Sequence, residues 1–136
     1  MTTKPSKNPK KTTGKANPPN VSFEVKSYQL VMQSRQVVVN EGEAVRYHYP
    51  YFNIFSDPAG GTATPSGQIF FYPSDYDIPN VGNENNGLQL TLGFHIEWFD
   101  DVQALLDTPG KLVCAVKYET GVVWGELDGP IVARTL

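Results

Sequence analysis

The stretch that decides the fold is Leu88-Gln89-Leu90-Thr91-Leu92-Gly93-Phe94-His95-Ile96-Glu97-Trp98. Apolar side chains occupy every second position from Leu88 to Trp98, and polar residues or glycine stand between them. A period of two is typical of a β-strand that has one face in the core and one polar face. We therefore predict a strand over residues 88–98.

Shorter runs of β-type residues lie on both sides of this stretch, separated by turn sequences rich in Gly, Pro, Asn and Asp. Strands are predicted at residues 21–32, 36–40, 43–49, 51–55, 68–72, 111–118, 122–126 and 130–135. The exception is Asp100 to Leu106, where carboxylates precede a helix-forming run, so a helix of one to two turns is expected. The segment from Ser56 to Gly67 is expected to form an exposed loop. Strands in sequence without alternating helices favour an all-β, antiparallel β-sandwich, and their number favours an eight-stranded jelly roll.

Charge and composition divide the chain at about residue 20. A length of 136 residues with 40% apolar side chains suits one domain. Residues 1–20 hold four prolines and no acidic residue, which predicts a disordered arm of charge +5, ahead of a single β domain of charge −8 at 21–136. Weak, salt-dependent contacts with nucleic acid phosphates are predicted for the lysines of the arm, Lys4, Lys7, Lys10, Lys11 and Lys15.

The chain shows neither a signal-peptide pattern at its N-terminus nor 18 consecutive apolar residues anywhere. We therefore expect a soluble protein made in the cytosol, with no membrane contact. Cys114 is the single cysteine, so no intramolecular disulfide can form. It shares strand parity with Leu112 and Val116, which predicts an inert thiol in the core.

Aromatic residues are densest between Arg46 and Phe52. Strand parity places Tyr47, Tyr49 and Tyr51 on one side, with Arg46 and His48 opposite. Tyrosines in such a row can anchor a protein partner or stack on nucleobases or sugars. The competing interpretation is that they fill the core and keep their hydroxyl groups at its rim.

Candidate metal ligands are the loop carboxylates Asp75 and Asp77, which could serve a Ca²⁺ ion with help from a second chain. Asp in turns more commonly caps backbone N–H groups. His48 and His95 have no partner that spacing can identify, and His95 is predicted on the polar face of its strand. Because no catalytic motif occurs either, we predict that the chain is not an enzyme and has no cofactor apart from the candidate calcium.

Several segments in the second half of the chain have the order and spacing seen in a known protein family. They are Ser66-Gly67-Gln68-Ile69-Phe70-Phe71-Tyr72, Ser74-Asp75-Tyr76-Asp77-Ile78-Pro79, Thr108-Pro109-Gly110-Lys111-Leu112-Val113-Cys114, Gly125-Glu126-Leu127 and Ile131 to Leu136. This block, Gly67 to Leu136, resembles the shell (jelly-roll) domain of small icosahedral virus coat proteins of the tombusvirus, sobemovirus and satellite-virus type. The resemblance implies a basic arm facing a particle interior, Asp75 and Asp77 at subunit junctions, and function through symmetric self-association.

Two hypotheses follow. The first is a viral structural protein of the coat type, found in the virion or in the cytoplasm of the producing cell, that self-assembles into homo-oligomers and contacts nucleic acid through its arm. The second is a non-enzymatic β-sandwich binding module, such as a phage decoration protein, a receptor- or sugar-binding domain, or an inhibitor of a host factor.

Overall fold

The computed structural model describes residues 18–34 and 49–133. The five lysines of the predicted arm, Tyr47, His48 and the predicted strand at 36–40 lie outside these ranges, as does all but the last residue of the predicted strand at 43–49.

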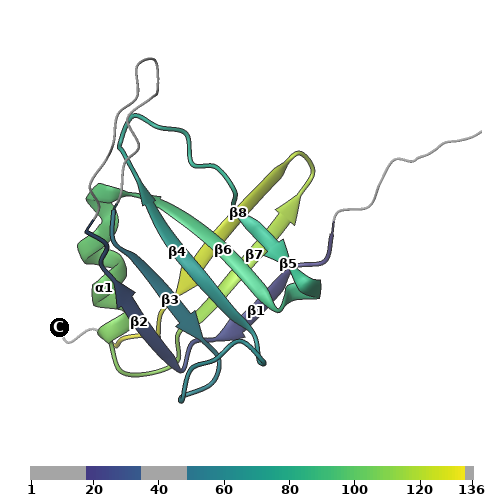
Figure 1. Ribbon diagram of the computed structural model, residues 1–136. Coiled ribbons are helices and arrows are strands. Elements are labelled where there is room, and N and C mark those ends of the chain that lie inside the picture. Colours follow the sequence, from purple (N-terminus) through teal and green to yellow (C-terminus); the bar gives the residue numbers. More distant parts are fainter. Residues whose placement is uncertain (1–17, 35–48, 134–136) are drawn as a thin grey trace, which may run out of the picture.

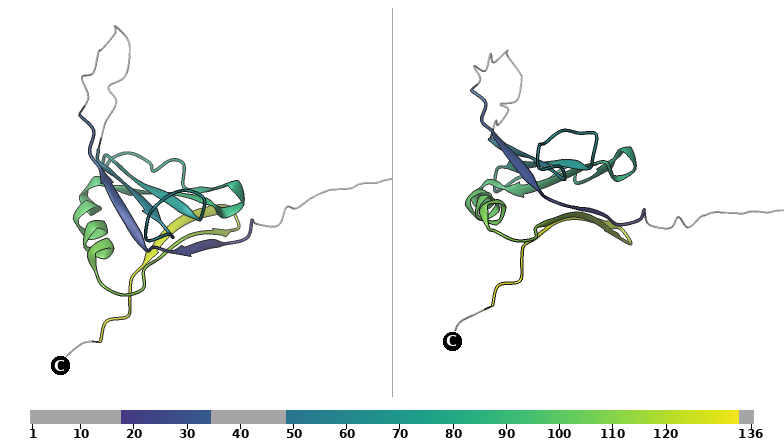
Figure 2. Two further views of the ribbon diagram at one scale, coloured as in Figure 1. Left: turned by 60° about the horizontal axis from the view of Figure 1, so that its bottom comes forward. Right: turned by 90° about the horizontal axis from the view of Figure 1, so that it is seen from below.

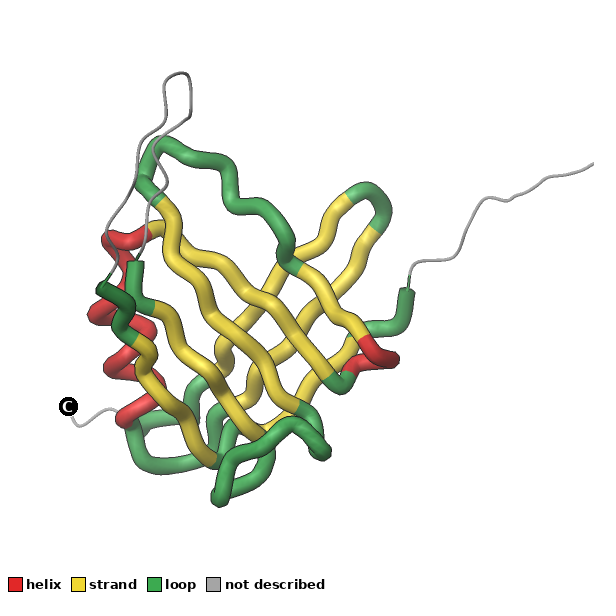
Figure 3. Tube along the Cα trace, in the orientation of Figure 1, coloured by secondary structure: helices red, strands yellow, loops and turns green. Residues whose placement is uncertain are grey.

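The described residues form two sheets, one α-helix and two short 3₁₀ turns (Figures 1 and 3). The strands are β1 (Val21–Glu24), β2 (Ser27–Val31), β3 (Tyr51–Phe55), β4 (Ser66–Tyr72), β5 (Gly82–Glu84), β6 (Gln89–His95), β7 (Val113–Glu119) and β8 (Val122–Asp128). The helix α1 spans Phe99–Asp107, and the 3₁₀ turns span Asn85–Gly87 and Ile96–Trp98. One sheet has the order β1-β7-β8, and the other has the order β2-β3-β4-β6-β5.

The two sheets lie in two layers, with α1 at one end of the molecule, as Figure 2 shows. Buried side chains from both sheets meet between the layers, and Phe52 of β3 is fully enclosed there. Phe99 at the start of α1 stacks on Phe52 with 5.3 Å between ring centroids and lies 5.0 Å from Phe71. The helix is thus fixed to the core by Phe99 and by Val102, which is also buried in the core cluster. No helix in the described ranges has the length and apolar character needed to cross a membrane.

The prediction of a mostly β chain with one short helix is confirmed, but strand boundaries differ, most of all in two of the predicted strands. The segment at residues 88–98 is a strand only from Gln89 to His95, because a 3₁₀ turn at 96–98 leads the chain into α1. The single strand expected at 21–32 is two strands, since β1 pairs with β7 in one sheet and β2 pairs with β3 in the other. Val25 and Lys26 carry the chain between the two sheets.

Two further differences concern residues 130–133, where a strand was predicted, and residues 82–84, where none was. Residues 130–133 form no strand. Residues 82–84, for which no strand was predicted, form the edge strand β5 and pair with β6. This strand is short and polar, so its sequence lacks the alternation that identifies longer strands.

The prediction of antiparallel pairing holds for every ladder except one, because β4 and β6 are parallel. Parallel neighbours need a connection of about a dozen residues or more. Residues 73–88 supply it: a loop crosses to the far side of β6, and β5 then turns back into β6 through the Asn85–Gly87 turn.

Candidate functional site

The outer face of the five-stranded sheet carries a set of polar side chains on neighbouring strands. In β3 the buried residues Phe52 and Ile54 alternate with Asn53 and Phe55, which point outward. In β4 the exposed Gln68 lies between the buried Gly67 and Ile69. The alternation that builds the core therefore also fixes which side chains form this outer surface.

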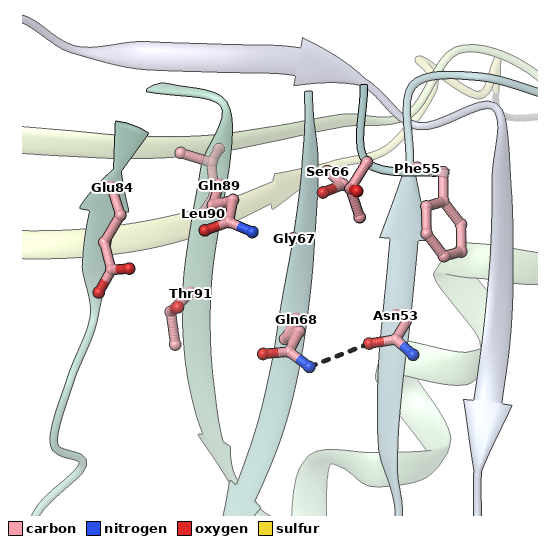
Figure 4. A pocket seen from close by; sticks show the side chains of 10 residues that line it. Asn53, Phe55, Ser66, Gly67, Gln68, Glu84, Gln89, Leu90 and Thr91 are labelled. Atoms are coloured by element: carbon pink, nitrogen blue, oxygen red, sulfur yellow. Dashed lines mark hydrogen bonds between the residues drawn. The ribbon is translucent and has the colours of Figure 1, made fainter. Parts of the chain in front are cut away.

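A groove of about 440 Å³ crosses this face (Figure 4). Its lining comes from β3, β4, β5, β6 and the loop after β3: Asn53, Phe55, Thr62, Ser66, Gly67, Gln68, Glu84, Gln89, Leu90 and Thr91. A volume of this size lies in the range of small-molecule sites. The side-chain amides of Asn53, Gln68 and Gln89 supply hydrogen-bonding groups, and Phe55 supplies an aromatic ring.

Neighbouring amides are joined across the strands in a hydrogen-bonded ladder. Gln68 Nε2 donates to Asn53 Oδ1 at 3.1 Å, and Asn53 Nδ2 donates to Gln29 Oε1 at 3.1 Å. These residues face one another in the strand register, which continues from Gln68 to Thr91 of β6. The ladder orients the amides and uses only one of the two N–H groups of Gln68.

The charge of the groove comes from one residue. Glu84, an exposed carboxylate on β5, is the single ionisable side chain among the lining residues, and no lysine, arginine or histidine belongs to the lining. The groove therefore disfavours anions and suits neutral hydrogen-bonding groups.

A loop covers the other end of the outer face. A Cβ atom built on Gly93 would lie 2.4 Å from Ile78 Cγ2, so glycine is what lets the 73–81 loop lie flat against β6. Nε2 of His95 lies 2.8 Å from the backbone oxygen of Tyr76 in the same loop. Burial raises the pKa of Tyr72, whose ring also borders Gly93. On the polar face of β6, Gln89 and Thr91 therefore line the groove, whereas Gly93 and His95 are covered by the 73–81 loop.

The predicted tyrosine row is divided in the structure. Tyr51 lies on the outer face, where its ring is 5.2 Å from that of Phe70. Tyr49 packs instead against the core cluster. Tyr49 and Tyr51 thus lie on different sides of the sheet, and Tyr47 falls outside the described residues. The role of these tyrosines as an interface stays a prediction.

Asp75 and Asp77 are both exposed in the loop after β4. In residues 18–34 and 49–133, no three His, Cys, Asp or Glu side chains gather in a way that could hold a metal ion. The calcium site at Asp75 and Asp77 therefore stays a prediction that needs ligands from elsewhere. Asp57 shows the other role expected of loop carboxylates, since its Oδ1 accepts a hydrogen bond from the backbone N–H of Ala59 at 2.8 Å.

Cys114 lies where strand parity predicted it, fully buried in β7 between the sheets. Burial raises the pKa of its thiol to about 12, so almost none of it is thiolate at neutral pH. The residue contributes packing to the core.

A different surface lies at the edge of the other sheet. β8 is its last strand, and Val122 is 57% exposed there. After β8 the chain continues through Ile131, which is fully exposed, and Val132, which is 71% exposed. Within β8, Glu126 accepts a hydrogen bond from Trp124 Nε1 at 2.7 Å and lies 3.0 Å from Lys117 Nζ. These hydrogen bonds lower the pKa of Glu126 and keep it ionised.

Comparison with known proteins adds no relative. No protein-family model matches the chain, and no curated protein or solved structure is significantly similar to it.

The groove residues Asn53, Gln68, Gln89 and Glu84 were missed at the sequence level. Asn53, Gln68 and Gln89 stand at polar positions of alternating strands, and such positions are equally typical of plain solvent-facing residues. Glu84 lies on the short polar strand β5, which has no alternation to mark it. What brings them together is the strand order β3-β4-β6-β5, which the spacing of residues along the chain does not reveal.

Proposed function

We propose that this chain is a self-assembling structural protein of the viral coat type. The observation that supports it best is the β8 edge, where a seven-residue strand ends its sheet and exposed apolar residues follow it. Main-chain N–H and C=O groups at such an edge can pair with another chain. Burial of the exposed apolar side chains would make the association more favourable. In this proposal, copies of the chain associate through this edge.

The family part of the proposal rests on the sequence resemblance. A jelly-roll shell is usually described as two four-stranded antiparallel sheets, whereas three and five strands with one parallel pair are seen among the described residues. The proposed assembly requires only a rigid two-layered body with a free edge. It therefore does not depend on jelly-roll topology.

The proposed edge contact is tested by replacing Val122 with lysine. Val122 is exposed, so the folded chain should accept the change, but a buried, unpaired ammonium group in the contact would oppose association. We expect the full chain to give large, uniform particles by light scattering and negative-stain microscopy, and the Val122→Lys variant to stay monomeric. Met32→Lys is the matched control, because Met32 is 76% exposed and directly follows β2, a strand of the other sheet. A wild-type chain that remains monomeric at high concentration would refute self-assembly.

The basic arm gives a separate prediction about nucleic acid. Five lysines that neutralise phosphates should make the logarithm of the binding constant fall with the logarithm of salt concentration, with a slope of about −3.5 to −4.5. Deleting residues 1–17 should abolish this binding and leave the melting temperature unchanged. The deletion keeps Asn20, whose Oδ1 accepts a hydrogen bond from the backbone N–H of Tyr118 at 2.9 Å. Binding that persists with the same slope in the shortened chain would show that the arm is not the contact.

The groove favours a second candidate function, a non-enzymatic binding module. Its amides are held on paired strands, and its volume suits a small ligand or part of a larger one. This function and assembly through β8 use different sheets, so each can be tested without the other.

A further inference from the structure

We propose that the groove on the five-stranded sheet binds a neutral carbohydrate. The inference rests on the second candidate function, the binding module, and is independent of assembly through β8. It adds the chemical class of the ligand.

Hydrogen-bonding capacity is the first argument. A sugar hydroxyl both donates and accepts, and it is best met by groups that do the same. The amides of Asn53, Gln68 and Gln89 come from three adjacent strands, and each carries N–H donors and a carbonyl acceptor. The Asn53 and Gln89 oxygens already accept one hydrogen bond each, from Gln68 and from Asn85 at 3.0 Å, and each keeps a second lone pair. In Figure 4 the Gln68 oxygen lies on the side of Thr91, away from the hydrogen bond to Asn53, so it faces the middle of the groove.

Charge is the second argument, and it separates a neutral sugar from a nucleic acid or an acidic sugar. Phosphates and carboxylates are held in proteins by cationic side chains or clusters of N–H donors. The lining of this groove contains no cation, and its one ionisable group, Glu84, is an anion that accepts hydrogen bonds from hydroxyl groups. A neutral polyol satisfies all of these groups without an opposing charge.

The Phe55 ring is the third argument. It points outward from the last residue of β3, is half-buried, and lines the groove at the end opposite Glu84. A sugar ring has one polar edge and an apolar C–H face, and an aromatic ring can cover that face while nearby amides bind the hydroxyls. Ligands that are polar on every side would leave this ring unused.

Rigidity also favours binding. Asn53 and Gln68 stand on paired strands in the interior of the sheet, and their mutual hydrogen bond orients both amides before any ligand arrives. Side chains that are already ordered lose less conformational entropy on binding. The site is therefore preorganised for several weak polar contacts.

The experiment is an NMR titration of the full chain carrying Val122→Lys, a change outside the groove that keeps the sample monomeric if the chain assembles. The probes are glucose, galactose, mannose, N-acetylglucosamine and lactose, with a short oligothymidylate for comparison. We expect at least one sugar to move the backbone and side-chain amide signals of Asn53, Gln68 and Gln89. Gln68→Ala should weaken that binding by about three- to tenfold through the loss of hydrogen bonds. Gln103→Ala on α1, outside the groove lining, removes the same amide elsewhere and should leave the affinity unchanged.

Each outcome decides the inference. Groove signals that move with a sugar and weaken in Gln68→Ala support it. Groove signals that move only with the oligothymidylate keep the binding module but overturn the carbohydrate. If no probe moves these signals, or if Gln68→Ala binds sugar as tightly as the parent chain, the carbohydrate inference is overturned. Light scattering of the wild-type chain reports on self-assembly separately, so neither result can be mistaken for the other.

Discussion

Replacing Phe52 with alanine is expected to lower the free energy of unfolding by about 3–5 kcal/mol. Phe52 has no exposed surface, and its ring lies 5.9 Å from Tyr28, 6.0 Å from Phe71 and 5.3 Å from Phe99 between centroids. The side chain thus joins β2, β4 and α1 to β3. Alanine would leave a cavity where these elements meet, and a loss of this size is a large part of the stability of a typical domain.

Urea unfolding followed by the fluorescence of Trp98 and Trp124 measures the effect. Phe55→Ala is the matched control, because Phe55 lies three residues away in the same strand but on the outer face, where it is only half-buried. Its loss should be about 1 kcal/mol. Equal losses in the two variants would contradict the assignment of Phe52 to the central core.

Alternation along the chain was enough to predict the β character and much of the core. Leu90 and Leu92, at apolar positions of the 88–98 stretch, are buried, and Cys114 lies inside as its parity predicted. The helix was also predictable, because Asp100 and Asp101 lie in its first turn, where carboxylates favour a helix N-terminus. These signals are local, so the sequence alone carries them.

The arrangement of the strands was not predictable in the same way. The parallel pairing of β4 with β6 depends on a connection that doubles back through β5, and the division of residues 21–32 depends on which strands they meet in space. Both are long-range choices that the period of an individual strand does not reveal. The groove was missed for this reason, because its residues become neighbours only through the strand order.

The positions of the two proposed surfaces have a consequence for function. The groove belongs to the five-stranded sheet, and the β8 edge belongs to the three-stranded sheet. Association through β8 therefore does not use the residues of the groove. A coat-type assembly that carries many weak sugar sites would bind a glycan-bearing surface by multivalency, with an avidity far above that of one site.

Replacing Gly125 with alanine is expected to destabilise the chain by about 1–3 kcal/mol, because Leu92 of the other sheet lies directly against this residue of β8. A Cβ atom built there would lie 2.4 Å from Leu92 Cγ and 3.1 Å from Leu92 Cδ1. Leu92 is 1% exposed, so its side chain has little room to move away. The sheets would have to separate locally.

Gly82→Ala in β5 is the matched control, since a Cβ atom there meets nothing within 4 Å. With no contact to disturb, alanine should be neutral or slightly stabilising at this position through its effect on the unfolded chain. The contrast between the two glycines separates close packing from the general preference of strands for a side chain.

A double-mutant cycle identifies the partner. Leu92→Ala alone should cost about 2–5 kcal/mol, but in that background Gly125→Ala should become neutral or stabilising, because the added methyl group fills part of the cavity. We therefore expect a favourable coupling energy of about 1–3 kcal/mol between the two positions, measured by urea unfolding of the four chains. Additive losses would mean that Gly125 and Leu92 do not contact each other across the sheets, and the packing of β8 on β6 described above would be wrong.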